Sequence, residues 1–163
     1  DLIHKNILKK VLEDLSAQRG LSCIIASHDP LDLLSWADKL LIMKAGKLIQ
    51  QDSPEMVYRQ PAEAYTGGLL GKYNLVAAGS VAASGLHPIP EGKQLFLRPE
   101  YLKLTDKEHG FAATVQQISF WGSYYELLLR TADQELVARA EQPFATKGQT
   151  VYISIQEHDY WYL

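Results

Sequence analysis

Apolar and polar residues alternate along the N-terminal part of the chain with the period of an amphipathic helix. Apolar side chains recur every three to five positions on one face, and lysines and acidic residues fill the other face. The apolar positions are Ile3, Ile7, Leu8, Val11, Leu12 and Leu15. Gly20 follows at a place where a left-handed residue commonly ends a helix. The pattern predicts a helix over residues 1–18.

The next segment, residues 21–27, is almost continuously apolar and predicts a strand. Its Ile and Cys residues are typical of a strand that is covered on both faces. Such a strand needs neighbours for its backbone hydrogen bonds, and the surrounding sequence encodes none. Pro30 suits the first position of a helix that should extend to about Ala37. This α/β part is therefore expected to be a fragment of a larger layered sheet.

A β-hairpin is predicted after this helix. Two short apolar runs, residues 39–44 and 47–51, lie on either side of Ala45-Gly46. A two-residue connection that ends in Gly is common in tight hairpin turns.

Two helical pieces should follow the hairpin. Ser53 is a favoured cap residue, and Pro54 suits the first helical position behind it. This helix should end before Pro61. A shorter helical piece is expected over residues 62–66, with Gly67-Gly68 stopping it.

After about Asn74 the helical period disappears, and short strand-like runs alternate with turn residues. The runs are Gln94–Leu97, Leu102–Leu104, Ala112–Ile118, Tyr124–Leu129, Leu136–Ala140, Val151–Ile155 and Tyr160–Tyr162. Seven short strands in about 70 residues predict a small barrel, which removes the exposed edges of a flat sheet. The expected organisation is an α/β fragment over residues 1–73 and an all-β, OB-like barrel over residues 74–163.

The composition is that of a globular protein, and its charge balance argues against some classes of binding partner. Of 163 residues, 47% are hydrophobic and 21% are charged, which is enough apolar material for a core. The formal net charge is −3, and residues 111–163 carry three basic and six acidic side chains. This balance argues against a general nucleic-acid or anionic-membrane binder. No apolar stretch approaches the roughly 18 residues of a membrane-spanning helix, so a soluble protein is expected.

Ser27, His28 and Asp29 close the expected strand of residues 21–27. The carboxyl end of a strand is where open α/β sheets usually bind ligands. The three residue types match a hydrolase triad, but neighbours on a strand point to opposite faces and cannot pass a proton among themselves. For His28 alone, a structural hydrogen-bonding role and a ligand-contacting role both stay open.

The sequence does not contain a complete phosphate loop. The nearest candidate is Thr66–Tyr73, in which Thr66 replaces the first Gly and Tyr73 replaces the hydroxyl that binds magnesium. No metal site is expected either, because the histidines are scattered and accompany only one cysteine. The histidines are His4, His28, His87, His109 and His158.

Aromatic residues are frequent in the barrel and are assigned to core and cross-strand packing. They are Phe120, Trp121, Tyr124, Tyr125, Tyr160, Trp161 and Tyr162. A base-stacking platform would need a basic groove to neutralise phosphates, and this part of the chain is acidic.

The order and spacing of several motifs in residues 1–72 resemble the C-terminal end of an ABC transporter ATPase subunit. The motifs are Asp1-Leu2 at the start of the first helix, Ser27-His28-Asp29, the run Ala37–Gln50, Ser53-Pro54-Glu55 and Tyr58–Pro61. The remainder of the chain is similar to the TOBE domain, an OB-like barrel appended to importer ATPases. The points of similarity there are Arg98-Pro99-Glu100 and Gly122-Ser123. Pro30 and Gln51-Asp52 depart from the family's pattern, which commonly has Gln and Gly there.

By this resemblance, His28 is the switch histidine that hydrogen-bonds the γ-phosphate and orients the attacking water. Asp1 matches the loop that reaches the partner subunit in the closed dimer. ATP and Mg²⁺ are the implied cofactors of the intact protein. The family's phosphate loop, signature motif and carboxylate pair have no counterpart here, so this chain alone is expected to be inactive and to bind neither.

The resemblance also implies a homodimer of ATPase subunits, membrane-spanning permease partners and a place on the inner face of the cell membrane. The barrel would support dimer contacts and hold a small regulatory ligand. A barrel that captures an oxyanion without any ATPase role is a second interpretation, with few basic candidates to pair with the anion. These are Arg98, Arg130, Arg139 and Lys147. A purely structural dimerisation domain is a third interpretation.

Overall fold

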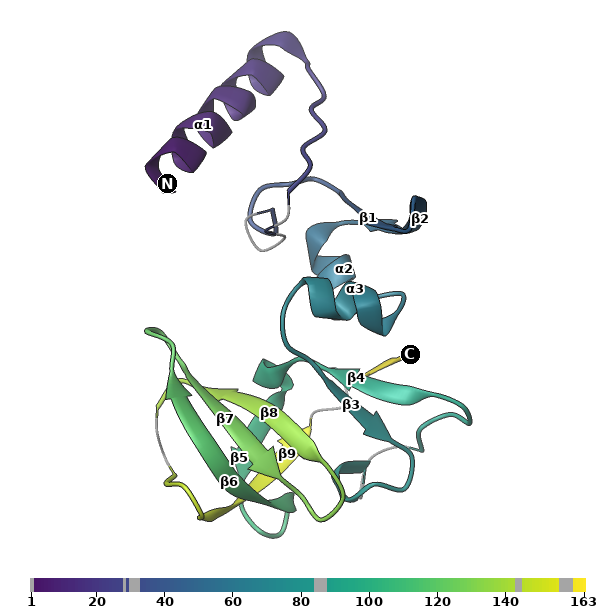
Figure 1. Ribbon diagram of the computed structural model, residues 1–163, viewed down its shortest axis with the longest axis vertical. Helices are drawn as coiled ribbons and strands as arrows, with labels where there is room; N and C mark the ends of the chain where they lie inside the picture. Colours follow the sequence, from purple (N-terminus) through teal and green to yellow (C-terminus); the bar gives the residue numbers. More distant parts are fainter. Residues whose placement is uncertain (1, 28, 30–32, 84–87, 143–144, 156–159) are drawn as a thin grey trace.

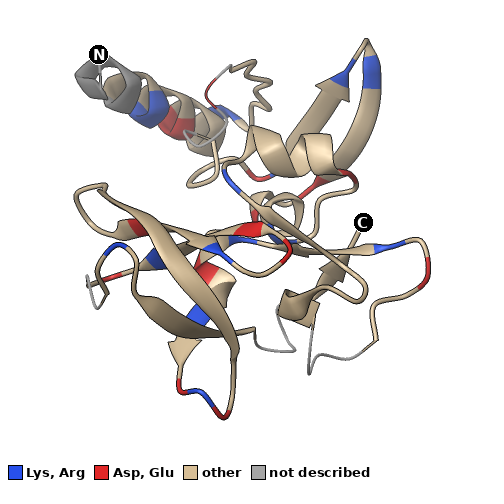
Figure 2. Ribbon diagram, turned by 60° about the horizontal axis from the view of Figure 1, so that its bottom comes forward, with Lys and Arg blue, Asp and Glu red and all other residues tan. Residues whose placement is uncertain are grey.

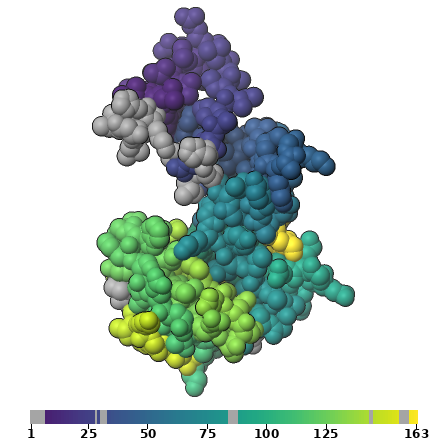
Figure 3. All heavy atoms as spheres, viewed as in Figure 1, coloured from purple at the N-terminus to yellow at the C-terminus, as the bar shows by residue number. Residues whose placement is uncertain are grey.

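Figure 1 shows the computed structural model, in which the elements follow one another from an N-terminal helix to a C-terminal β region. The residues that the structure describes are 2–27, 29, 33–83, 88–142, 145–155 and 160–163. The space-filling view places the N-terminal residues at one end of the molecule and the β region at the other (Figure 3).

Helix α1 spans Leu2–Arg19, which confirms the first predicted helix. Gly20 ends it with a φ of 63°, and its N–H donates to the carbonyl of Ser16 over 2.9 Å. The described apolar side chains of this helix are largely exposed, although they lie on one face. The exposed ones are Ile7, Leu8, Val11 and Leu15, whereas Leu12 is half-buried.

The strand predicted over residues 21–27 is wrong for this chain, because the segment has no regular secondary structure and its side chains are exposed. Ile24 is 92% exposed. A lone extended segment has no partner for its backbone hydrogen bonds, so it cannot form a ladder. The helix predicted up to Ala37 is also wrong in its described part, where residues 33–36 make one turn.

The hairpin prediction is confirmed. Strand β1, Leu40–Lys44, pairs antiparallel with β2, Lys47–Asp52. Ala45 and Gly46 between them have φ values of 47° and 75°. Two consecutive positive φ angles suit the right-handed twist of the flanking strands.

Helices α2, Pro54–Arg59, and α3, Ala64–Leu69, follow the hairpin. The Ser53 hydroxyl accepts a hydrogen bond from the Met56 N–H, which confirms the predicted cap. The predicted stop of the second helix at Gly67-Gly68 is wrong, because α3 continues through both glycines. No helix in the described part of the chain is both long and apolar enough to cross a membrane.

Residues 33–72, here called the hairpin–helix unit, have only a small core. Its buried apolar side chains are Leu40, Ile42, Val57 and Leu70. The Gln50 side chain joins hairpin to helices, because its amide donates to the Gln60 carbonyl and its oxygen accepts from the Ala62 N–H. So few buried side chains cannot offset the conformational entropy of ordering the unit.

Residues 74–163, the β region, form two antiparallel sheets and confirm the predicted strands. The three-stranded sheet has the order β10-β4-β3 and the five-stranded sheet the order β5-β9-β6-β7-β8. The strands are β3 Asn74–Ala77, β4 Gln94–Leu97, β5 Leu102–Thr105, β6 Phe111–Phe120, β7 Tyr125–Arg130, β8 Glu135–Ala140, β9 Thr150–Ile155 and β10 Trp161–Tyr162. Strand β3 was not predicted from the sequence.

The five-stranded sheet curls until its edge strands, β5 and β8, approach each other. Four antiparallel pairings separate them, so the two strands run in the same direction. No ladder joins them among the described residues. Two 3₁₀ turns, η2 Val81–Ala83 and η3 Pro99–Tyr101, pack beside this sheet. The described structure is thus mostly β-sheet and consistent with an OB-like domain, whereas a layered α/β sheet is not formed.

Gly67 gives a test of how α3 packs on the β region. A Cβ added there would lie 2.5 Å from Cε2 of Phe96, whereas one added at Gly68 would meet only Tyr73, at 3.4 Å. The Phe96 ring is fully buried and cannot move aside without cost. Gly67→Ala should therefore destabilise the protein by about 1–3 kcal/mol.

The matched control is Gly68→Ala, which should stabilise the protein by up to about 1 kcal/mol through helix propensity. Urea unfolding of the three proteins gives both values. Equal effects of the two substitutions would show that α3 does not pack on Phe96 as described.

Candidate functional site

The two site residues predicted from the sequence, Asp1 and His28, lie outside the described residues. The two residues that flank His28 in the sequence are hydrogen-bonded to each other. The Asp29 N–H donates to the Ser27 hydroxyl over 3.0 Å, and this hydroxyl donates to the Asp29 carbonyl over 3.2 Å. The roles assigned to Asp1 and His28 stay predictions.

The densest polar site in the described structure surrounds Arg98, which links β4 to η3 and is 0% exposed. Every polar contact of its guanidinium is to a backbone carbonyl of the hairpin–helix unit. Nε and Nη2 donate to Tyr58 O over 3.1 and 3.0 Å, and Nη1 donates to Gly67 O, Gly71 O and Lys72 O over 2.9, 3.2 and 3.2 Å. We call this set of contacts the junction.

The geometry of α2 and α3 explains why a cation lies here. The last carbonyls of a helix have no partner within it, and they carry the negative end of its dipole. Tyr58 is in the last turn of α2, and Gly67 is in the last turn of α3. An arginine can satisfy both ends at once, because its planar group has five donors and stays charged when buried.

Two aromatic rings lie close to this guanidinium. Its Cζ lies 4.0 Å from the ring centroid of Tyr58 and 4.9 Å from that of Phe96, both within cation–π range. Phe96 in turn stacks on Tyr73, with 5.3 Å between centroids. Burial lowers the pKa of Arg98 from its ordinary value, while the nearby Tyr58 and Glu100 oppose this shift.

The network continues from the junction to the five-stranded sheet. The Tyr58 hydroxyl donates to Glu100 Oε1 over 2.6 Å. Burial, together with this hydrogen bond, raises the pKa of Tyr58 well above its ordinary value. Arg139 of β8 lies 3.8 Å from the other oxygen of Glu100, and its Cζ lies 3.9 Å from the Tyr124 ring centroid.

Further contacts lie on either side of the junction, one joining β3 to β8 and one joining the hairpin–helix unit to β10. Asn74 exchanges two hydrogen bonds with the backbone of Val137 on β8, over 2.9 and 2.7 Å. Trp161 on β10 donates from Nε1 to the Pro61 carbonyl over 2.8 Å. The site therefore joins the hairpin–helix unit to the β region. The charged groups of Arg98, Glu100 and Arg139 interact there with other groups of the protein.

Known proteins are similar to this chain over most of its length. The family profile described as the TOBE domain matches residues 95–163. The chain is 31% identical to the Fe(3+) ions import ATP-binding protein of Streptomyces avermitilis, over 91% of this chain and 47% of that protein. It is 27% identical to the spermidine/putrescine import ATP-binding protein of Clostridium novyi, over 83% of the chain and 43% of the relative. It is 32% identical to the sulfate/thiosulfate import ATP-binding protein 1 of Chromobacterium violaceum, over 78% of the chain and 39% of the relative.

The predicted resemblance is confirmed. The chain is similar to the C-terminal part of ABC importer ATP-binding subunits, and its β region includes the TOBE domain match. It spans less than half the length of each of these three relatives.

Arg98 in the TOBE region was a candidate partner for an oxyanion, and the structure shows that this assignment is wrong. Its guanidinium is buried and saturated by carbonyls, so it cannot face a ligand. Of the other basic candidates, Arg130 is paired with Glu135 over 2.6 Å and Arg139 with Glu100. Figure 2 shows basic and acidic positions scattered over this region instead of gathered by sign.

The assignment of barrel aromatics to cross-strand packing is confirmed for two that lie outside the core. Phe120 and Trp121 are 66% and 57% exposed. At the turn of the β6–β7 hairpin, the Phe120 ring lies tilted against Tyr125 and the Trp121 ring stacks on Tyr124. In the part of the chain that the structure describes, no group of three or more His, Cys, Asp and Glu side chains could hold a metal ion.

The roles of Tyr58 and Glu100 were not predicted from the sequence. Both belong to motifs that carried the family resemblance, Tyr58–Pro61 and Arg98-Pro99-Glu100. The signal was present, but only the fold shows that these two motifs meet.

Replacing Arg98 tests the junction. Arg98→Met would leave several buried carbonyls without donors, so we expect a loss of about 3–5 kcal/mol in the free energy of unfolding. Arg98→Lys keeps the charge but not the planar set of donors, and it should lose at least about 2 kcal/mol.

Arg130→Met is the matched control, because it breaks an exposed ion pair worth no more than about 1 kcal/mol. Chemical denaturation measures all three variants. A loss in Arg98→Met no larger than that in Arg130→Met would contradict the role of the junction.

Tyr58 gives a test by pH. Because its pKa is raised in the folded state, the unfolded chain releases this proton first, and folding stability falls as pH rises above about 10. In Tyr58→Phe, the slope of the free energy of unfolding against pH should be shallower by the equivalent of up to one proton. Tyr65→Phe, at an exposed position, should leave the contribution of Tyr58 to this slope unchanged. Denaturation midpoints between pH 8 and 11 measure the slope. Equal slopes for wild type and Tyr58→Phe would show that the hydroxyl is not held by Glu100.

Proposed function

We propose that this chain is the C-terminal part of an ATP-hydrolysing subunit that powers import across a bacterial cell membrane. The printed names of the relatives support this, since each is an import ATP-binding protein. In this proposal residues 1–73 complete the ATPase domain, and residues 74–163 form an appended TOBE barrel.

The observation that carries the proposal is an apolar surface near the N-terminus that nothing in the described structure covers. The exposed side chains are Ile7, Leu8, Val11 and Leu15 on α1, and Leu21, Ile24 and Ile25 after it. An exposed set of this size marks a surface that another polypeptide covers. An ATPase domain would cover it if residues 21–27 formed a strand within the layered sheet of that domain, packed beside α1.

His28 would then lie at the carboxyl end of a completed strand. An imidazole can donate to the terminal phosphate of ATP while its other nitrogen is fixed by the protein. The described residues do not include a phosphate loop or a metal-binding cluster, so the remaining phosphate contacts and the Mg²⁺ ligands would come from other polypeptide. Asp1 would contact the partner subunit.

The partners in this proposal are a second ATPase subunit and membrane-spanning permease subunits, on the inner face of the membrane. The TOBE barrel would support dimer contacts and hold a small regulatory ligand. The relatives' names give three different cargoes, an iron ion, polyamines and sulfur oxyanions, so they do not select one for this chain.

A chimaera tests the proposal. Residues 1–163 would replace the matching C-terminal part of the Streptomyces avermitilis relative, whose own N-terminal part supplies the missing ATPase elements. The chimaera should hydrolyse MgATP, and His28→Ala should slow it at least about tenfold, equivalent to roughly 1.4 kcal/mol of barrier.

The matched control is His109→Ala, because His109 is an exposed histidine that pairs with Asp106 in the turn between β5 and β6. Its turnover should equal that of the unaltered chimaera. A chimaera that is active and insensitive to His28→Ala would remove His28 from the mechanism. A folded chimaera without any MgATP hydrolysis would contradict the proposed function.

A further inference from the structure

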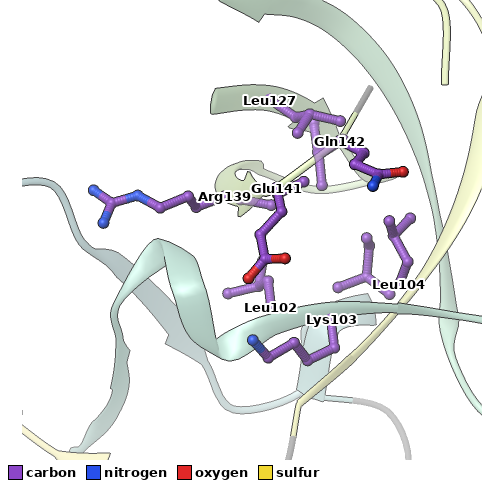
Figure 4. A pocket seen from close by; sticks show the side chains of 11 residues that line it. Leu102, Lys103, Leu104, Leu127, Arg139, Glu141 and Gln142 are labelled. Carbon is purple, nitrogen blue, oxygen red and sulfur yellow. The ribbon is translucent and has the colours of Figure 1, made fainter. Parts of the chain in front are cut away.

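A cavity of about 370 Å³ lies in the wall of the β region, between strands β5 and β8 (Figure 4). Residues from both strands line it, together with residues of β7 and β9 behind them. They are Leu102, Lys103, Leu104, Leu127, Leu129, Ala138, Arg139, Ala140, Glu141, Gln142 and Ile153. None of the residues of the junction lines this cavity.

The cavity exists because the five-stranded sheet does not close here. β5 and β8 approach each other in parallel orientation, but no ladder joins them in the described structure. Their facing edges leave a gap that opens onto the core. Leu127, Leu129 and Ile153 form its floor, and each is no more than 2% exposed. An apolar group that entered would be removed from water against this floor.

One positively and one negatively charged side chain lie at the opening of the cavity. Lys103 on β5 and Glu141, just beyond β8, are both exposed, and neither has an ion-pair partner among the described residues. Figure 4 shows the Glu141 side chain extending over the cavity, with Lys103 below it. Arg139 adds no free charge, because it is held by Glu100 and the Tyr124 ring.

The edge of β8 offers backbone groups as well. Asn74 bonds both the N–H and the C=O of Val137, so these groups point away from β7. In an antiparallel pair the backbone groups of alternate residues point the same way. The N–H and C=O of Arg139, two residues on, therefore also point away from β7, on the side where β5 lies.

We propose that this cavity binds a small zwitterion with an aliphatic body, the chemistry of a free aliphatic amino acid. The aliphatic part contacts the leucine floor, the carboxylate pairs with Lys103 and the Arg139 N–H, and the ammonium pairs with Glu141. A bare oxyanion would leave the apolar floor unfilled. The inference rests on the part of the proposed function that gives the TOBE barrel a regulatory ligand, and it names the site and the ligand class.

Titration calorimetry of the full 163-residue chain tests this inference, with L-leucine as the probe. L-leucine should bind. 4-Methylpentanoate and isopentylamine, each with one of the two charges, should bind at least about tenfold more weakly. Sulfate should not compete. Absence of L-leucine binding, or equal binding of the singly charged probes, would overturn the proposal.

Variants locate the site. Lys103→Gln and Glu141→Gln should each weaken L-leucine binding at least about tenfold, and Ala140→Leu should abolish it by filling the cavity. Lys107→Gln and Glu108→Gln, in the exposed turn after β5, are matched controls and should bind normally. Normal binding by Lys103→Gln, Glu141→Gln and Ala140→Leu would place the ligand elsewhere and overturn the inference.

This outcome is independent of the ATPase test. L-leucine binding is measured on the 163-residue chain itself. Absence of binding would therefore not change how the effect of His28→Ala on the chimaera is interpreted. Conversely, an inactive chimaera would not affect the calorimetry.

Discussion

The buried guanidinium of Arg98 is the interaction on which the arrangement of this chain depends. From its position directly after β4, it binds one carbonyl in the last turn of α2, one in the last turn of α3 and two in the segment that follows α3. The hairpin–helix unit has four buried apolar side chains of its own. Such a core is too small to fold alone, so the unit takes its order from the β region, and Arg98 lies at the centre of the contacts between them.

Burying an arginine is costly, and the surroundings offset that cost in three ways. Carbonyl oxygens accept hydrogen bonds from all three of its nitrogens, and the rings of Tyr58 and Phe96 lie close to it. Glu100 supplies negative charge nearby and accepts a hydrogen bond from Tyr58. The same carboxylate faces Arg139, whose stem lines the cavity between β5 and β8. A ligand in that cavity would therefore lie next to a network that ends on α2.

Local patterns predicted the local structure. The Ser53 cap, the Ala45-Gly46 turn and the strand runs of the β region each depend on a few neighbouring residues, and all are present. Features that depend on distant residues were not predictable in this way. Residues 21–27 have strand chemistry but no partner, and the role of Gly67 depends on Phe96, almost 30 positions away. Arg98 could be recognised as part of a motif, but its burial depends on carbonyls from another part of the chain.

Native-state hydrogen exchange of the unaltered chain tests the central claim most directly. If the junction makes the hairpin–helix unit depend on the β region, the slowest amides of α2 and α3 should open with the same free energy as those of β4, and with the same response to denaturant. Amides of α2 and α3 that exchange through a separate, much cheaper opening while β4 stays protected would contradict the account.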